Sequence, residues 1–185
     1  MTDDELKRAL REHAYLEGEF VLRSGRRSRY YLDKYRFETR PDLLAALGDR
    51  LAEAVRAHAP DAVRLAGPEL GAVALAAAAS LASGLPFLIV RKAVKDYGTA
   101  KRVEGEFAAG EPVCVIEDVV TSGGALLESV HALRAAGVVV RTAVCVVDRD
   151  EGGAAELARH GVRLRRLFTG ADVLSAAKVP AQPHG

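Results

Sequence analysis

The chain has 185 residues, of which 49% are hydrophobic and 28% charged, a balance typical of one soluble globular domain. Its formal net charge of +1 excludes a global attraction to nucleic acid or to a membrane surface, so any anion site must be local. The start lacks the basic and apolar regions of a signal peptide, and Cys114 and Cys145 have no metal or redox spacing. We therefore expect a cytoplasmic protein, with neither nucleic acid nor membrane as a partner, whose cysteines are reduced core residues.

The N-terminal part is predicted to form a helix followed by a hairpin. Residues 2–17 have the pattern of an amphipathic helix whose inner face includes Leu6 and Leu10, with Gly18 at its end. Residues 20–33 then have the pattern of two short strands around a turn rich in arginine. On the residues alone, this turn is best interpreted as a solvated loop.

From residue 41 onward, helix and strand patterns alternate along the chain. Helix patterns cover 41–57, 72–83, 123–136, 153–160 and 170–178, and apolar strand patterns cover 62–66, 86–90, 112–116, 138–147 and 162–168. Such alternation predicts an α/β fold with a central, mostly parallel sheet flanked by helices. We expect a single domain over 1–185, with an N-terminal helix and hood over 1–40, an α/β core over 41–178 and a disordered tail over 179–185.

The stretch 112–125 combines an apolar strand, two acids, two hydroxyls and a glycine-rich helix start. Glu117 and Asp118 follow the apolar run, and the helix pattern begins near Gly123. Free backbone N–H groups at a helix start bind anions, and glycines let a phosphate approach them closely. Adjacent carboxylates suit the hydroxyl groups of a sugar, or a hard cation such as Mg²⁺. The stretch therefore indicates a ribose 5-phosphate site; the alternative is an ordinary strand-to-helix turn with two solvated acids.

A cationic loop follows the strand pattern at 86–90. Arg91, Lys92 and Lys95 lie within five residues of one another, and the polar connection 99–105 comes next. Clustered cations on a long connection indicate a mobile loop that closes over a polyanion. The alternative is a surface loop of ordinary charge.

Arg149 follows the β-branched strand pattern at 138–147. Open α/β sheets bind their ligands at the carboxyl ends of the strands, and a guanidinium can bond both oxygens of a carboxylate. Arg149 is therefore a candidate ligand for a carboxylate. The alternative is a loop arginine that pairs with its neighbours Asp148 or Asp150.

Four segments resemble one enzyme family. The stretch 112–125 resembles the phosphoribosyl pyrophosphate (PRPP) signature of type I phosphoribosyltransferases. Two strings resemble segments of the orotate phosphoribosyltransferases, namely Phe-x-Leu-x-Ser-Gly-x-x-Ser-x-Tyr-Tyr at 20–31 and Arg-Lys-x-x-Lys-x-x-Gly at 91–98. Arg149 stands in a string like the family's Val-Asp-Arg. On these motifs the chain is identified as a member of the orotate phosphoribosyltransferase family.

The resemblance implies the type I phosphoribosyltransferase fold and a reaction. The 5-phosphoribosyl group of PRPP would pass to orotate, giving orotidine 5′-monophosphate and pyrophosphate in pyrimidine biosynthesis. Mg²⁺ would be held mainly by PRPP and water, without direct protein ligands. The resemblance also implies a homodimer in which the loop that carries Lys95 reaches the neighbouring subunit's site.

The resemblance also assigns roles to residues. Lys95 and Asp118 would be catalytic. The residues that would bind PRPP are Arg23, Arg91, Lys92, Lys95, Glu117, Asp118, Val119, Val120, Thr121, Ser122, Gly123, Gly124 and Ala125. The residues that would bind orotate are Tyr31, Thr121 and Arg149.

The chain departs from the family pattern at three places. Arg23 stands where many members carry Lys, and Tyr97 where many carry His. Glu69-Leu70 replaces the Tyr-Lys pair of many bacterial members, in a loop one residue shorter, so we expect only backbone contacts with pyrophosphate there.

Two alternative functions remain open at this point. A phosphoribosyltransferase for a purine would lack a use for Arg149, because a neutral purine has no carboxylate. A non-catalytic regulator that senses PRPP and binds nucleic acid would need a basic face or a further domain, and the net charge of +1 argues against it.

Overall fold

The fold is built on a six-stranded sheet in the computed structural model, which describes residues 1–21, 25, 27–92 and 101–176. Its strands are β3 (Arg64–Pro68), β4 (Phe87–Val90), β5 (Val103–Glu104), β6 (Pro112–Val120), β7 (Val139–Asp148) and β8 (Arg163–Thr169). They follow the order β5-β4-β3-β6-β7-β8, and every neighbouring pair is parallel except β4 with β5. The mostly parallel sheet is confirmed. The strand β5 was not predicted, because two residues are too few to show a period.

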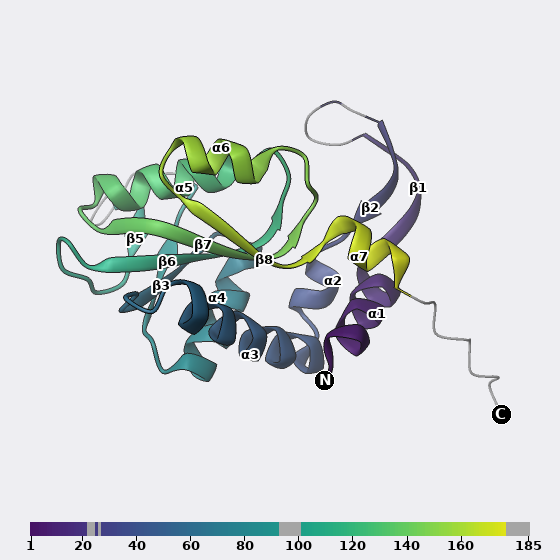
Figure 1. The fold of residues 1–185 in the computed structure, drawn as a ribbon, viewed down its shortest axis with the longest axis horizontal. Coiled ribbons are helices and arrows are strands. Elements are labelled where there is room, and N and C mark those ends of the chain that lie inside the picture. The colour runs from purple at the N-terminus through teal and green to yellow at the C-terminus, as the bar shows by residue number, and fades with distance from the viewer. Residues whose placement is uncertain (22–24, 26, 93–100, 177–185) are drawn as a thin grey trace.

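Helices cover both faces of this sheet (Figure 1). One face carries α3 (Pro41–His58) and α4 (Gly71–Ser83), and the other carries α5 (Gly124–Ala135) and α6 (Gly153–Arg159). The core accordingly lies in two layers, one on each side of the strands. The free thiols of Cys114 and Cys145 lie one in each layer, buried as the sequence predicted.

The N-terminal helix is shorter than predicted. Helix α1 (Asp3–Ala14) begins with a capping box between Thr2 and Glu5 and ends before Tyr15, which starts strand β1 (Tyr15–Val21). Gly18 lies inside this strand and does not end the helix. Residues after Ala14 leave the helix because they pair with a neighbouring strand, a tertiary interaction that a helical pattern cannot show.

The predicted hairpin is present. Strand β1 pairs antiparallel with β2 (Arg27–Leu32), and the short helix α2 (Tyr35–Glu38) follows. Figure 1 shows the hairpin extending beyond one end of the main sheet, with α1 and α2 beneath it. Helix α2 was not predicted, since four residues carry no helical period.

Strand β6 is longer than predicted and contains both acids of the signature stretch. It continues past Ile116 to Val120 because β7 runs beside it, with Val120 opposite Asp148. Glu117 and Asp118 are thus part of the sheet. The pattern ended too early because an acid normally marks the end of an apolar strand.

The C-terminal end of the described chain is α7 (Gly170–Ser175), and the predicted tail lies outside the described residues. None of the helices in the described ranges combines the length and apolar character needed to cross a membrane.

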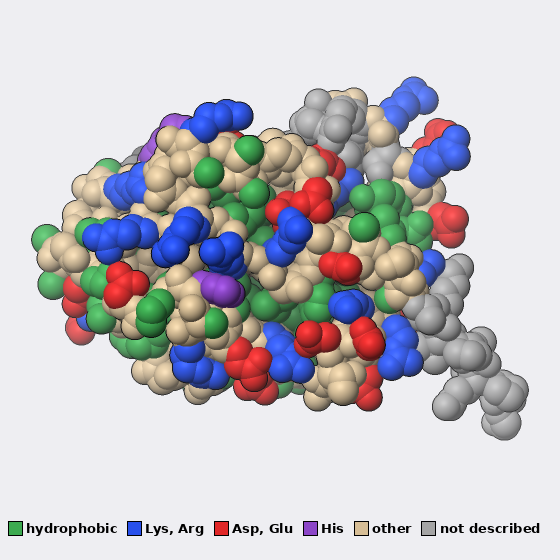
Figure 2. All heavy atoms as spheres, viewed as in Figure 1, with side chains coloured by type: hydrophobic (Ala, Val, Ile, Leu, Met, Phe, Trp, Pro, Cys, Tyr) green, Lys and Arg blue, Asp and Glu red, His purple; other side chains and the backbone are tan. Residues whose placement is uncertain are grey.

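Strand β8 forms one edge of the sheet and exposes Arg163 and Arg165. Cationic side chains hinder pairing of a sheet edge with another chain. On the side of the molecule seen in Figure 2, Lys and Arg side chains are interspersed with Asp and Glu side chains.

Candidate active site

The candidate site lies at the carboxyl edge of the sheet, where the strand order reverses. The chain runs outward from β3 to β4, then returns to place β6 on the other side of β3. In open α/β sheets, ligands bind outside the carboxyl ends of the strands at such a reversal. The turn 67–71 after β3 and the loop 121–123 after β6 flank this point.

The loops that follow β6 and β7 are joined by backbone hydrogen bonds. The Arg149 N–H donates to the Val120 carbonyl at 2.9 Å, and the Gly153 N–H donates to the Thr121 carbonyl at 3.0 Å. A Cβ on Gly153 would lie 2.6 Å from that Thr121 oxygen, so the close approach requires glycine. The loop before α5 and the loop before α6 therefore form one unit.

The start of α5 is open to an anion. Gly123 precedes the helix with φ +84°, and no side chain caps the first turn. The N–H groups of a first helical turn have no partners within the helix. Ser122, Gly124 and Ala125 are exposed and Thr121 is half-buried. The stretch thus presents the uncapped, glycine-rich helix start that the sequence predicted.

The two acids are buried, which excludes the alternative of two solvated carboxylates. Asp118 is 2% exposed and Glu117 is 8% exposed. Asp118 Oδ2 accepts a hydrogen bond from Lys34 Nζ at 2.6 Å, and Asp118 Oδ1 accepts one from the Val119 N–H at 2.6 Å. Burial, with the charge of Asp118, raises the pKa of Glu117 well above its ordinary value.

Helix α2 brings two further ionisable groups to Asp118. Lys34 precedes the helix, and Glu38, 3% exposed, ends it. Burial, followed by the charge of Asp118, raises the pKa of Glu38 to about 8. Burial lowers the pKa of Lys34, but its ion pair with Asp118 outweighs that effect and leaves the pKa raised. The sequence analysis missed Lys34 and Glu38; their only signal was a Lys and a Glu four residues apart after the hairpin.

Arg149 is held against the hairpin. Its Nη2 donates to the Tyr30 hydroxyl at 3.2 Å, and its guanidinium carbon lies 4.9 Å from the centroid of the Tyr30 ring. Its Nε lies 3.1 Å from Glu151 Oε1, and its side chain is 9% exposed. The hairpin therefore reaches the carboxyl edge of β7.

Among the described interactions, Arg149 pairs with Glu151 and not with Asp148 or Asp150. Arg166 Nη1 lies 3.3 Å from Asp148 Oδ2 and 2.5 Å from Asp150 Oδ1. Because Arg166 takes both carboxylates, the local pairing that the sequence allowed for Arg149 is absent from the described interactions.

Tyr31 lies away from Arg149. It is 41% exposed and packs on Phe20, with ring centroids 5.6 Å apart. Neighbouring residues of a strand point to opposite faces, so Tyr30 contacts Arg149 and Tyr31 does not. Tyr30 is a site residue that the sequence analysis missed.

The first part of the cationic loop is tied to the turn after β3. The Lys92 N–H donates to Glu69 Oε1 at 2.8 Å, while the Glu69 N–H donates to the Val90 carbonyl at 2.8 Å. Arg91 Nη1 lies 3.7 Å from Glu104 Oε1 in β5. The predicted residues Arg23 and Lys95, like Tyr97, lie outside the described residues.

Comparison with known proteins decides the family, although no family model matches the chain. An orotate phosphoribosyltransferase of Methanocella arvoryzae is 48% identical over 173 residues, which span 93% of this chain and 97% of that protein. The chain belongs to the orotate phosphoribosyltransferase family.

Solved orotate phosphoribosyltransferases share the fold. The crystal structure of the enzyme from Aeropyrum pernix has a TM-score of 0.81 at 36% identity and covers 94% of this chain and 96% of that one. The structure of the Mycobacterium tuberculosis enzyme in complex with PRPP has a TM-score of 0.77 at 32% identity, covering 92% and 98%. The resemblance found in the sequence motifs is confirmed.

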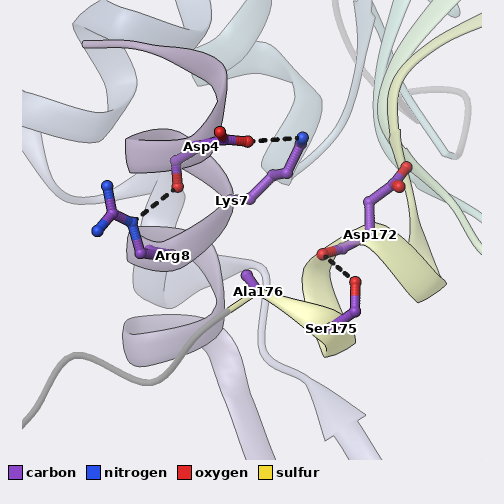
Figure 3. Close-up of a pocket in the computed structure, with 6 residues that line it drawn as sticks. All are labelled: Asp4, Lys7, Arg8, Asp172, Ser175 and Ala176. Carbon is purple, nitrogen blue, oxygen red and sulfur yellow. Dashed lines mark hydrogen bonds and ion pairs between the residues drawn. The ribbon is translucent and has the colours of Figure 1, made fainter.

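A cavity of about 460 Å³ lies away from these orotate phosphoribosyltransferase motifs, between α1 and α7 (Figure 3). Its lining residues are Asp4, Lys7, Arg8, Asp172, Ser175 and Ala176. Figure 3 shows that its polar groups bond to one another, as in the 3.1 Å pair of Lys7 Nζ with Asp4 Oδ1. None of the predicted site residues lines it.

Proposed function

We propose that this chain transfers the 5-phosphoribosyl group from PRPP to orotate and releases pyrophosphate at the carboxyl edge of β3, β6 and β7. One observation carries the proposal: the loop 121–123, which leads into the uncapped start of α5, is joined to the segment after β7. The Gly153 N–H donates to the Thr121 carbonyl in this loop, and the Arg149 N–H donates to the carbonyl of Val120, which precedes the loop. A phosphate site and a carboxylate-binding guanidinium thus belong to one structural unit, as a phosphoribosyl donor and an orotate acceptor require.

The proposed chemistry needs positioning and charge stabilisation more than a nucleophile. The bond from the anomeric carbon to pyrophosphate breaks and a bond to a ring nitrogen of orotate forms, through a transition state that resembles a ribosyl cation. The ring nitrogen gives up its proton to water or to the released pyrophosphate. The N–H groups of 121–125 hold the 5-phosphate, and Glu117 and Asp118 accept hydrogen bonds from the ribose hydroxyls. Oriented dipoles and carboxylates that are fixed before the reaction can stabilise this charge without reorganising.

The cationic loop is proposed to bind the leaving pyrophosphate. Arg91, Lys92 and Lys95 neutralise its negative charge, and Arg23 adds a further contact from the hairpin. Mg²⁺, a cation that prefers oxygen ligands, is held mainly by PRPP and water and supplies additional charge neutralisation when bound.

Orotate is proposed to lie between the hairpin and the loop after β7. Arg149 bonds its carboxylate, replacing the contact with the Tyr30 hydroxyl, and Thr121 orients the ring from the phosphate loop. Tyr31 is proposed as a second aromatic contact, which requires a rearrangement of the exposed ring that now packs on Phe20.

A homodimer is proposed as the active form, with Lys95 shared across subunits. Helix α4 contains no charged residue. It also presents leucines to solvent, since Leu81 is 89% exposed and Leu70, just before the helix, is 68% exposed. An uncharged helix face that a second copy covers would explain these exposed leucines.

A cytoplasmic location is also proposed, and the buried free thiols of Cys114 and Cys145 support it. Residues 1–185 are proposed to form one domain.

The deciding experiment is orotate consumption, followed by ultraviolet absorbance, with PRPP and Mg²⁺ present and with adenine, hypoxanthine and uracil run in parallel. Turnover confined to orotate supports the proposal and the role of Arg149. Turnover with another base keeps the PRPP site and overturns the assignment of orotate. Tight PRPP binding without turnover of any base contradicts the enzymatic function.

A further inference from the structure

Three separate elements converge on the Asp118 carboxylate. Lys34 and Glu38 come from the ends of α2, Asp118 comes from β6, and Gly71 starts α4. A Cβ on Gly71 would lie 2.5 Å from Asp118 Oδ2 and 2.5 Å from Glu38 Oε2. The two carboxyl groups therefore fill the space above the start of α4 and lie close to each other.

Stability alone does not explain this cluster. A buried ion pair loses so much hydration that apolar residues of the same size are often equally stabilising or better. Glu38 adds a second acid beside Asp118, and its Oε1 is buried without a hydrogen-bond partner among the described residues. A fold that needed only packing here would be better served by a leucine at 38.

The hydrogen bonds leave Asp118 able to accept more. Each carboxylate oxygen can accept two hydrogen bonds. Among the described residues, Oδ1 accepts one from the Val119 N–H and Oδ2 accepts one from Lys34 Nζ. Lys34 also places a compensating positive charge 2.6 Å from Asp118, whose side chain is buried. Glu38 sits beside it as a neutral acid, and the charged groups around that acid are Asp118, Lys34 and Asp33.

We propose that Lys34 and Glu38 are positioning residues that hold the Asp118 carboxylate in a fixed orientation, as a hydrogen-bond acceptor for a ribose hydroxyl of PRPP. Lys34 supplies the compensating charge, and the carboxyl of Glu38 donates its proton toward Asp118. This inference rests on the proposed role of Asp118 in binding PRPP. It adds α2 to the elements that build the site.

The test measures PRPP binding by calorimetry in the presence of Mg²⁺, with thermal unfolding as a check of the fold. Lys34→Met is expected to weaken PRPP binding by about tenfold or more, the scale of a hydrogen bond to a charged group. Lys34→Arg, which keeps the charge, is expected to retain most of the affinity. Lys7→Met is the matched control, because Lys7 pairs with Asp4 on α1, away from the site.

Two variants of Glu38 separate positioning from structure. Glu38→Gln keeps a neutral donor and is expected to bind PRPP within about threefold of the parent, whereas Glu38→Leu removes the donor and is expected to lose about tenfold while the protein unfolds at an equal or higher temperature. If Lys34→Met does not fold, the PRPP affinity of Glu38→Leu tests the inference in its place. PRPP affinity within twofold of the parent in Lys34→Met, or in Glu38→Leu, overturns the inference. Turnover of orotate by the parent protein is measured separately, so failure of the proposed function is recognised independently.

Discussion

At the scale of single residues, the site depends on side chains whose contacts are long-range in sequence. Tyr30 and Arg149 are 119 positions apart and share a hydrogen bond of 3.2 Å. The motifs identified Arg149 as a candidate, because the type of residue and its place after a strand carry information. The motif at 20–31 contains Tyr30, but only its neighbour Tyr31 was assigned to the site. Lys34 and Glu38 stand in none of the motifs, since only the packing of α2 on the sheet brings them to the site.

Replacement of Arg149 tests the carboxylate site. Arg149→Lys keeps the charge but loses the planar pair of N–H donors, so we expect kcat/KM for orotate to fall by about 10–100-fold while KM for PRPP stays within about threefold. Initial rates over a range of orotate concentrations measure this effect. Arg163→Lys, on the exposed edge strand, is the control. A loss below about threefold would contradict the assigned role of Arg149.

Replacement of Lys95 tests the cationic loop. Lys95→Ala is expected to lower turnover by roughly 10²–10³, the scale of losing one preorganised charge donor. Saturating rates with PRPP and orotate measure it, and Lys101→Ala provides a control lysine near the same connection. A change of less than about threefold would remove Lys95 from the catalytic set.

At the scale of elements, the local sequence pattern predicted the elements that have such a pattern and missed the element ends that depend on pairing with a neighbouring strand. Most of the parallel strands and the helices after them lie near their predicted bounds, because an apolar run or a helical period is a local feature of the sequence. The helix end at Ala14 and the extension of β6 to Val120 were missed because both depend on a neighbouring strand. The short elements α2 and β5 carry no period that could reveal them.

The joined loops after β6 and β7 give a prediction at this scale. In Gly153→Ala, the new methyl group would meet the Thr121 carbonyl at 2.6 Å and must displace the phosphate loop. We expect weaker PRPP binding, by about tenfold or more, since an ångström-scale misplacement of a binding group costs on that order. Gly170→Ala is the control, because its new Cβ would have no atom nearer than 3.6 Å. Unchanged PRPP affinity in Gly153→Ala, measured by calorimetry, would show that the loop tolerates the shift.

At the scale of the whole molecule, the buried acid Glu38 makes stability depend on pH. Its pKa is raised from 4.5 to about 8 by burial and by the charge of Asp118. Between these values the folded protein keeps a proton that the unfolded chain has released, so the contribution of Glu38 to stability falls as pH rises. It is fully present below pH 4.5 and is lost as pH passes about 8.

Glu38→Gln removes this titration. We expect the difference in melting temperature, variant minus parent, to grow in favour of the variant from about pH 4.5 to about pH 8 and then to level off. Thermal unfolding of both proteins across that range measures it. A difference that is constant with pH would mean that Glu38 is ionised in the folded protein at neutral pH.

The backbone hydrogen bonds that join the residues after β6 and β7 are also expected to link the two proposed substrates energetically. An anion that orders the loop before α5 restrains Thr121 and Val120, and through them the backbone of Arg149 and Gly153. Occupancy of the phosphate pocket would then raise the affinity for the base, and by thermodynamic reciprocity the base would raise the affinity for the phosphate by the same factor. These two backbone hydrogen bonds are therefore expected to add cooperativity between donor and acceptor beyond that of the direct contact that the proposed reaction requires.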